Sequence, residues 1–285
     1  LLIFEAVFFA LPLVTAAIYL EEAFFSFLIS IALCLGVGGL CMLGTPKTEA
    51  IYTKEGFVIV ALSWVVLSLF GALPFYFSGA LPSYVDALFE TVSGFTTTGA
   101  TIFPDGMAIE NLPKSLLIWR SFTHWIGGMG VLVFIMAFLP LSGAQNMHMM
   151  KAESAGPKVG KLVPKVKQTA KILYTIYAGM TLIQLILLLL GGMPVFDAVN
   201  TAFATAGTGG FSIKADGMAG YSSYLQIVVA VFMFLFSINF NAYYLIGKGK
   251  WRDALTTEIK VFCGIVFTAI ALILANLFLN GVVDY

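Results

Sequence analysis

Two short segments rich in glycine and threonine carry the residue types that could do chemistry in this sequence. Residues 93–101 read Ser-Gly-Phe-Thr-Thr-Thr-Gly-Ala-Thr, and residues 205–212 read Thr-Ala-Gly-Thr-Gly-Gly-Phe-Ser. A cation that leaves water needs a ring of replacement oxygen ligands. Glycine lets a chain turn its backbone carbonyls toward such an ion without a Cβ in the way, and threonine adds a hydroxyl oxygen. The alternative is that these residues serve only close packing between helices.

The two segments lie in an internal repeat, which aligns without a gap when Asp86 is paired with Asp197. Nine of the 23 positions from 86 to 108 are identical in the second copy, against about one in sixteen expected by chance for average usage. The identical pairs are Asp86/Asp197, Ala87/Ala198, Thr97/Thr208, Gly99/Gly210, Ile102/Ile213, Asp105/Asp216, Gly106/Gly217, Met107/Met218 and Ala108/Ala219. Two segments in one register favour a shared role over packing alone.

The composition excludes a water-soluble domain. Of the 285 residues, 60% are hydrophobic and 11% are charged, whereas soluble domains carry about 25% charged residues. The 15 basic and 15 acidic side chains cancel, so the chain lacks the positive field that nucleic-acid binding requires. Its three cysteines (Cys34, Cys41 and Cys263) show neither paired nor metal-ligand spacing.

Seven apolar stretches have the length of about 20 residues that a transmembrane helix needs. They lie at about 1–20, 23–43, 56–78, 115–140, 171–192, 223–246 and 259–280. We therefore expect an all-α polytopic membrane protein. The segments 82–113 and 193–220 are too short and too polar to span, and each contains a short helical stretch that opens at an acid, Asp86 or Asp197. Irregular backbone at membrane depth is tolerated only where protein or water satisfies its amides, so both segments are predicted to be re-entrant loops that line a pathway.

The basic residues are strongly biased to one side of the predicted spans, which the positive-inside rule makes the cytoplasmic side. Twelve of the 15 lie there: Lys47, Lys54, Lys151, Lys158, Lys161, Lys165, Lys167, Lys171, Lys248, Lys250, Arg252 and Lys260. The two Gly/Thr-rich segments therefore face outward. Both repeat copies then have the same orientation, related by an axis along the membrane normal, and such units can surround a central pore.

An enzyme is disfavoured. The spans contain no His-Glu-x-x-His, no paired aspartates and no nucleophile with a base in reach, and the glycine-rich segments lack the Lys-Ser/Thr of a phosphate-binding loop. The alternative to an ion-conducting protein is a non-conducting structural or regulatory membrane subunit. The chain begins inside an apolar run without a methionine and stops just after another, so we expect a piece of a longer polypeptide.

Three motifs carry a resemblance to a known family: residues 93–101, Trp125-Ile126-Gly127-Gly128-Met129-Gly130, and Gly209-Gly210-Phe211-Ser212. They resemble the Trk/Ktr superfamily of potassium transporters, specifically the N-terminal part of the membrane subunit of bacterial Trk systems. The resemblance implies an architecture of four fused units around one pore, each consisting of a helix, a pore loop and a second helix, as in potassium channels. In Trk proteins two extra helices precede these units. The resemblance implies two extra helices at 1–43, a first unit at 56–140, a second unit at 171–246 and the first helix of an incomplete third unit at 259–285. Two of the four filter segments are then absent, so a closed filter needs either the rest of a longer polypeptide, which we expect, or a second chain.

The resemblance also implies the site. Gly99 and Gly210 are the filter glycines, and potassium is bound by this filter, which comprises Thr97, Thr98, Gly99 and Ala100 in the first copy and Thr208, Gly209, Gly210 and Phe211 in the second. Glycine rather than serine at position 99 resembles the potassium-selective form. The implied activity is potassium uptake across the cytoplasmic (inner) membrane of a bacterium or archaeon, with potassium as the transported ion and no other cofactor. Passive flux and symport with protons or sodium are both compatible with these residues.

The implied partners are a cytoplasmic nucleotide-binding regulatory ring subunit, a second copy in a homodimer, and the lipid bilayer. Two ionisable residues of the fourth predicted span also stand out. Arg120 either tunes the field of the outer vestibule or snorkels to the interface beside Trp119 and pairs with an outer carboxylate. For His124, a proton-relay role is the less favoured interpretation.

Overall fold

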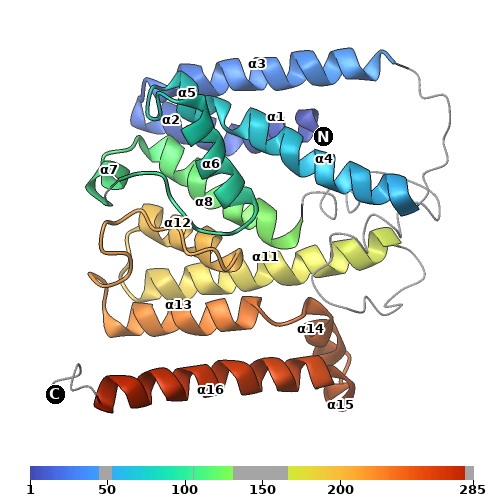
Figure 1. The fold of residues 1–285 in the computed structure, drawn as a ribbon, viewed down its shortest axis with the longest axis vertical. Coiled ribbons are helices and arrows are strands. Elements are labelled where there is room, and N and C mark those ends of the chain that lie inside the picture. Colours follow the sequence, from blue (N-terminus) through green and yellow to red (C-terminus); the bar gives the residue numbers. More distant parts are fainter. Residues whose placement is uncertain (45–52, 105, 131–165, 280–285) are drawn as a thin grey trace. The chain divides into compact units, whose positions relative to one another are not determined.

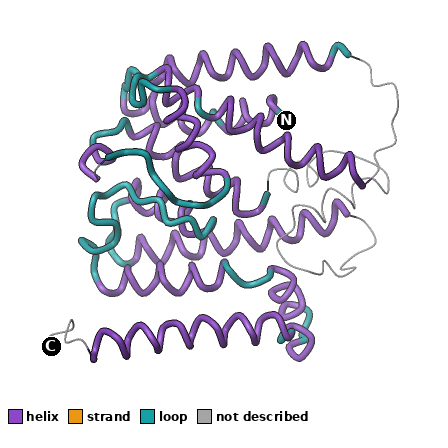
Figure 2. The backbone as a smooth tube through the Cα atoms, in the orientation of Figure 1, coloured by secondary structure: helices purple, strands orange, loops and turns teal. Residues whose placement is uncertain are grey.

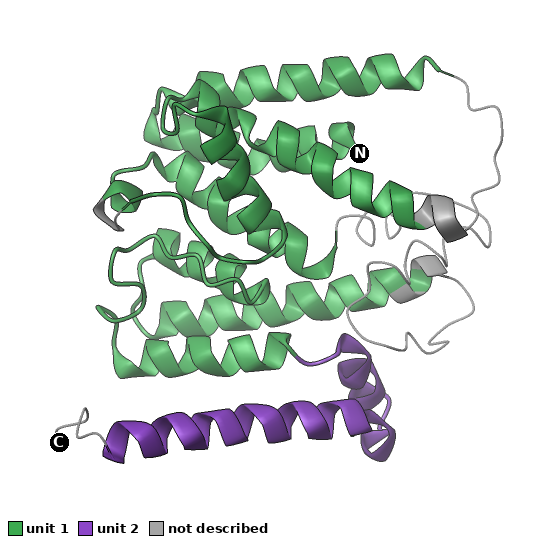
Figure 3. Cartoon of the chain, viewed as in Figure 1, with its two compact units in different colours: residues 1–237 green, residues 238–285 purple. Residues whose placement is uncertain are grey.

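The computed structural model describes residues 1–44, 53–104, 106–130 and 166–279. These residues form helices joined by loops, and no strand occurs among them (Figure 2). The chain divides into two compact units, Leu1–Ser237 and Ile238–Tyr285 (Figure 3). The prediction of an all-α polytopic protein is confirmed, because five of the described helices are long and apolar enough to cross a membrane.

The first three predicted spans are present as helices. The span at 1–20 consists of two consecutive helices, and the span at 56–78 ends in a short helix of its own. The bounds are α1 (Leu2–Phe8), α2 (Ala10–Tyr19), α3 (Ala23–Met42), α4 (Thr53–Gly71) and α5 (Leu73–Phe77). Their outer faces carry large exposed apolar side chains such as Ile18, Phe25 and Leu62, which suits contact with lipid.

The fifth and seventh predicted spans correspond to α11 (Val166–Leu190) and α16 (Thr257–Leu279). The fourth begins as α8 (Lys114–Met129). Residues 131–140 of that span, and the predicted cytoplasmic lysines between 151 and 165, lie outside the described residues.

The sixth predicted span, at 223–246, is not one continuous helix. It consists of α13 (Ser223–Phe236) and α14 (Phe240–Gly247), which have the length and apolarity of a span only when taken together. The interruption has a local cause, because the Asn239 side chain accepts a hydrogen bond from the Asn241 amide at 3.0 Å and so caps a new helix. Within the compact unit Ile238–Tyr285, α14 packs on α15 (Trp251–Ala254).

The internal repeat is visible in the helix ends. The two short helices α6 (Tyr84–Phe95) and α12 (Val195–Ala206) have 12 residues each. Their N-caps are Ser83 and Pro194, and their C-caps are Thr96 and Gly207, so both boundaries fall at equivalent positions of the repeat. A helix of this length extends about 18 Å, which is well short of the bilayer core. In the first copy the return segment also contains a small helix, α7 (Gly106–Glu110).

The helix α8 lies at the centre of the compact unit Leu1–Ser237. It packs on α2, on α6 and on α12, so it contacts the short helix of both repeat copies (Figure 1). Its Trp119 is fully buried, lies with its ring centroid 4.5 Å from that of Phe9, and donates an indole hydrogen bond to the Gly71 carbonyl at 2.9 Å. This core fixes α8, and α8 in turn positions the two loops that follow α6 and α12.

Candidate functional site: two paired backbone loops

The loops that follow α6 and α12 have the same backbone hydrogen bonds. In each copy two successive amides at the start of the loop donate back to carbonyls in the last turn of the short helix. The bonds are Thr97 N to Gly94 O (3.0 Å) and Thr98 N to Ser93 O (2.9 Å), and, at the equivalent positions of the second copy, Thr208 N to Thr205 O (2.8 Å) and Gly209 N to Ala204 O (3.2 Å). The repeat therefore specifies a conformation as well as a pattern of residue types.

Both loops also contain residues of positive φ at alternate positions. Thr97 and Gly99 have φ of 54° and 74°, and Thr208 and Gly210 have φ of 55° and 80°, while the residues between them do not have positive φ. A left-handed conformation costs a non-glycine residue about 1–2 kcal/mol. The two threonines therefore adopt it only because the surrounding hydrogen bonds and packing require it.

The two loops touch each other at Gly99. A Cβ placed on Gly99 would overlap the carbonyl oxygen of Gly209, so the close approach of the two loops requires glycine at position 99. The equivalent Gly210 is less crowded, because the nearest atom to a Cβ there is Met233 Cε at 3.6 Å. The structure thus brings the predicted filter segments 97–100 and 208–211 into contact at Gly99 and Gly209.

Among the predicted filter residues, Thr98 and Ala100 are exposed in the first copy and Thr208 and Gly210 in the second, whereas Phe211 is buried. The carbonyl of Ala100 accepts a hydrogen bond from Ser93 Oγ at 2.6 Å, so one of its lone pairs is already engaged by the short helix. This bond anchors the end of the first loop to α6.

Two adjacent glycines let α8 reach the ends of both short helices. A Cβ on Gly127 would overlap the carbonyl oxygen of Phe95, the last residue of α6. A Cβ on Gly128 would lie 2.8 Å from the Cα of Gly207, the C-cap of α12, and 2.7 Å from the hydroxyl of Tyr177. The Gly-Gly pair of the fourth span therefore serves close approach, as in other membrane helix contacts.

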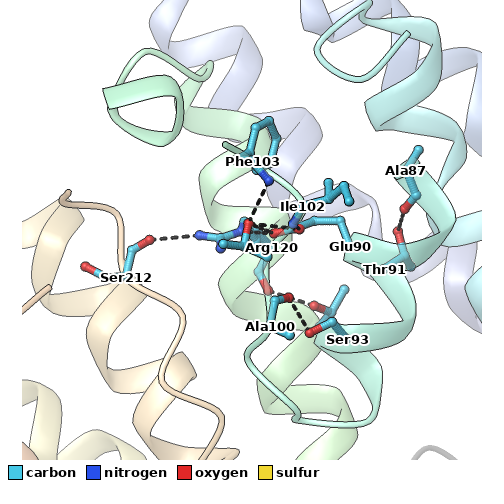
Figure 4. A network of polar contacts seen from close by, with 11 residues as sticks. Ala87, Glu90, Thr91, Ser93, Ala100, Ile102, Phe103, Arg120 and Ser212 are labelled. Carbon is cyan, nitrogen blue, oxygen red and sulfur yellow. Dashed lines mark hydrogen bonds and ion pairs between the residues drawn. The ribbon is translucent and has the colours of Figure 1, made fainter. Parts of the chain in front are cut away.

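A buried ion pair joins α6 to α8. Arg120 Nε donates to Glu90 Oε1, and the two residues are only 3% and 1% exposed (Figure 4). Arg120 is therefore buried and does not snorkel to an interface, which corrects that expectation, whereas its influence on the field of the outer vestibule stays a prediction. The pairing with a carboxylate is as expected, but the partner Glu90 was not identified from sequence. The available signal was its place in α6, one turn from the buried Ala87 on the helix face that packs inward.

Both members of this pair also bind the chain that follows each loop. The Glu90 carboxylate accepts hydrogen bonds from Thr101 Oγ1 at 3.0 Å and from the Ile102 amide at 2.9 Å. On the other side, Arg120 Nη1 donates to the Ser212 carbonyl at 2.8 Å (Figure 4). The carboxylate and the guanidinium are thus both satisfied within protein, as buried charges must be.

The ring of Phe211 contacts two side chains of α8 that are one turn apart. The guanidinium carbon of Arg120 lies 3.8 Å from the ring centroid, a cation–π distance. The imidazole of His124 stacks on the same ring at 4.1 Å with an interplanar angle of 11°. The observed contact of His124 is therefore with the second loop.

Two further polar contacts hold the segments that follow the loops. Tyr221 donates to Asp197 Oδ2 at 2.7 Å, and burial together with this bond raises the pKa of Tyr221 above its ordinary value. Glu110 Oε1 accepts a hydrogen bond from the Ala215 amide at 2.7 Å, which links the outer segment of the first copy to that of the second.

Comparison with known proteins identifies the family of this chain. A model of the TrkH family, described as a cation transport protein, matches residues 23–280. The Trk system potassium uptake protein TrkH of Salmonella typhimurium is 34% identical over 284 residues, which cover 96% of this chain and 57% of that protein. The Trk system potassium uptake protein TrkG of Escherichia coli is 34% identical over 88% of this chain and 52% of its own length. An uncharacterised cation transporter of Methanocaldococcus jannaschii is 32% identical over 88% of this chain and 52% of its own length.

The fold agrees with these sequence matches. The crystal structure of the potassium transporter TrkH from Vibrio parahaemolyticus superposes with a TM-score of 0.73 at 31% identity, over 89% of this chain and 51% of that chain. The chain thus spans little more than half the length of the relatives it matches. The matched family is one of cation transport proteins and not of enzymes, and several helices of this chain are long and apolar enough to cross a membrane. With a match that runs through nearly the whole sequence and a fold in common, the chain belongs to the TrkH family of cation transport proteins.

Proposed function

We propose that this chain supplies two loops of a potassium-selective filter and so takes part in potassium uptake across the inner membrane. The observation that carries the proposal is the pairing of the two loops, which repeat one backbone conformation and meet at Gly99 and Gly209. The names of the relatives support the choice of ion, because the proteins of Salmonella typhimurium and Escherichia coli are potassium uptake proteins of the Trk system.

The alternating backbone suits the binding of a dehydrated cation. Where residues of positive and negative φ alternate, successive carbonyl groups can turn to the same side of the chain, as in a carbonyl-lined filter. Carbonyls of the two loops would then replace the water shell of a potassium ion. In this proposal the ligands come from Thr97, Thr98 and Gly99 in the first loop and from Thr208, Gly209 and Gly210 in the second, and Ala100 and Phe211 anchor the two loops.

The short helices add an electrostatic contribution. Both α6 and α12 end directly at a loop, so the partial negative charge at each helix C-terminus lies next to the proposed ion path. Such an arrangement favours a cation over an anion. Because both helices end at equivalent repeat positions, the two contributions act on the same stretch of the pathway.

Two loops form only part of a closed ring of carbonyls. The chain spans little more than half the length of its relatives, so we propose that the remaining loops are supplied by further residues of a longer polypeptide. We also propose that the protein works with partner subunits, as the designation Trk system of the relatives implies. The specific partners in this proposal are a nucleotide-binding regulatory ring on the cytoplasmic side and a second copy of the same protein.

The test uses the full native reading frame in a bacterium stripped of its own potassium uptake. We expect this frame to restore growth on limiting potassium and to take up rubidium, and we expect Gly99→Ser to alter the uptake or its preference for potassium. A serine at 99 would meet the Gly209 carbonyl and an unfavourable φ, so a normal phenotype would contradict the filter assignment. If the frame reaches the membrane with its partner subunit supplied and still gives no uptake, a structural or regulatory subunit becomes the better description.

A further inference from the structure

The buried ion pair of Glu90 and Arg120 binds residues at equivalent positions of the two repeat copies. Thr101 and Ser212 occupy the same position in the repeat and are the first residues after the respective loops. Thr101 donates its hydroxyl to Glu90, and the Ser212 carbonyl accepts from Arg120, while Glu90 and Arg120 bind each other. The backbone segments that follow the two loops are therefore connected through the side chains of Glu90 and Arg120 (Figure 4).

The connection breaks the symmetry of the repeat. The position equivalent to Glu90 in the second copy is Thr201, which carries no charge. The helix that follows the second loop, α13, contains no charged residue, whereas α8 carries the buried Arg120. The first copy thus supplies both charges, and the second copy contributes the backbone carbonyl and the Phe211 ring that they hold.

We infer that Glu90 and Arg120 are positioning residues that set the spacing between the two filter loops, and through it the discrimination between potassium and other monovalent cations. This inference rests on the proposed function. Neither side chain is placed against the ion. Each acts through backbone that is continuous with the loops, since Thr101 follows Ala100 and Ser212 follows Phe211.

The chemistry of the pair suits this role. A guanidinium is a planar fork that can donate to two acceptors in fixed directions, here the Glu90 carboxylate and the Ser212 carbonyl, and it lies over the Phe211 ring at the same time. A lysine keeps the charge but has no such fork. The arrangement therefore predicts that the geometry of Arg120, and not its charge alone, controls the position of the second loop.

The experiment compares three variants in the full native reading frame. Arg120→Lys keeps the charge and removes the fork. The double variant Glu90→Gln with Arg120→Gln removes both charges together and leaves neither one buried alone, so it tests the pair even if single neutral variants fold poorly. Glu110→Gln is the matched control, because Glu110 also links the two copies but is exposed, and a glutamine oxygen still accepts from the Ala215 amide.

The first readout is the ratio of rubidium to sodium uptake, measured per amount of folded protein in the membrane. We expect both pair variants to lower this ratio about tenfold, the change that corresponds to losing roughly one charge-assisted hydrogen bond, and the control to keep it. A merely structural role predicts less folded protein with an unchanged ratio, and that result would overturn the inference.

The second readout is amide hydrogen exchange across residues 207–213, which requires no transport. The pair variants should exchange faster in this segment than the wild type and the control. If the wild-type frame gives no uptake, the proposed function fails, and the exchange data still decide the positioning role. Unchanged exchange in both pair variants would refute that role even in a protein that transports potassium normally.

Discussion

The carbonyl oxygen of Gly209 occupies the space that a side chain at Gly99 would need. This contact joins two loops that belong to different copies of the repeat and that adopt the same alternating backbone. It also distinguishes the two proposed filter glycines, because Gly99 is required both by its positive φ and by the neighbouring loop, and Gly210 by its φ alone.

Alanine at the two proposed filter glycines, Gly99 and Gly210, should therefore have unequal effects. At either site alanine in the left-handed region costs about 1–2 kcal/mol. Gly99→Ala adds an overlap with the Gly209 backbone, whereas at Gly210 the nearest atom is the flexible end of Met233. We expect rubidium uptake by the full native frame to fall much further in Gly99→Ala than in Gly210→Ala. Equal losses would argue against a contact between the loops.

The packing of α8 against the short helices predicts a destabilising substitution at Gly128. A Cβ there would press on the Gly207 backbone and the Tyr177 hydroxyl, and such overpacking costs about 1–3 kcal/mol. Thermal unfolding in detergent should show a lower melting temperature for Gly128→Ala. The control is Gly179→Ala on α11, where a Cβ meets nothing within 4 Å and the melting temperature should not fall.

The first turn of α8 is capped by the carboxylate of Glu21, which lies between α2 and α3. Glu21 accepts hydrogen bonds from the amides of Lys114 and Ser115 at 2.6 and 3.0 Å, and so acts as a cap at the positive end of the helix. Glu21→Ala should lower the free energy of unfolding by about 1 kcal/mol, a typical value for a lost cap. Its neighbour Glu22 makes no cap bond to α3, so Glu22→Ala should leave stability unchanged in the same denaturation assay.

Potassium should stabilise the full native protein more than sodium does. A ligand that binds the folded state at a hundred times its Kd adds about 2.7 kcal/mol to the free energy of unfolding. Melting in potassium chloride and in sodium chloride of equal ionic strength checks this, because general salt effects cancel. Gly99→Ser should reduce the difference, and an identical melting temperature of the wild type in both salts would contradict a potassium-selective site.

The sequence by itself determined the helical spans and the repeat. A run of about 20 apolar residues has one favourable arrangement in a bilayer, so the spans at 1–20, 23–43 and 171–192 could be predicted from composition alone. The constant offset between the two copies likewise agrees with the common ends of α6 and α12: an Asp-Ala pair recurs in the first turn of each helix, and the loops that follow have the same backbone hydrogen bonds.

Only the tertiary structure decided which residues meet. The bond of Glu90 to Arg120 crosses 30 residues, and that of Arg120 to Ser212 crosses 92, and such pairs depend on how α6, α8 and the second loop pack. The interruption after α13 was also hidden, because the apolar run continues through it while the Asn239 cap redirects the backbone. Hydropathy reports the transfer of a side chain from water to lipid, whereas the partner of a buried polar group is set by the distances between helices.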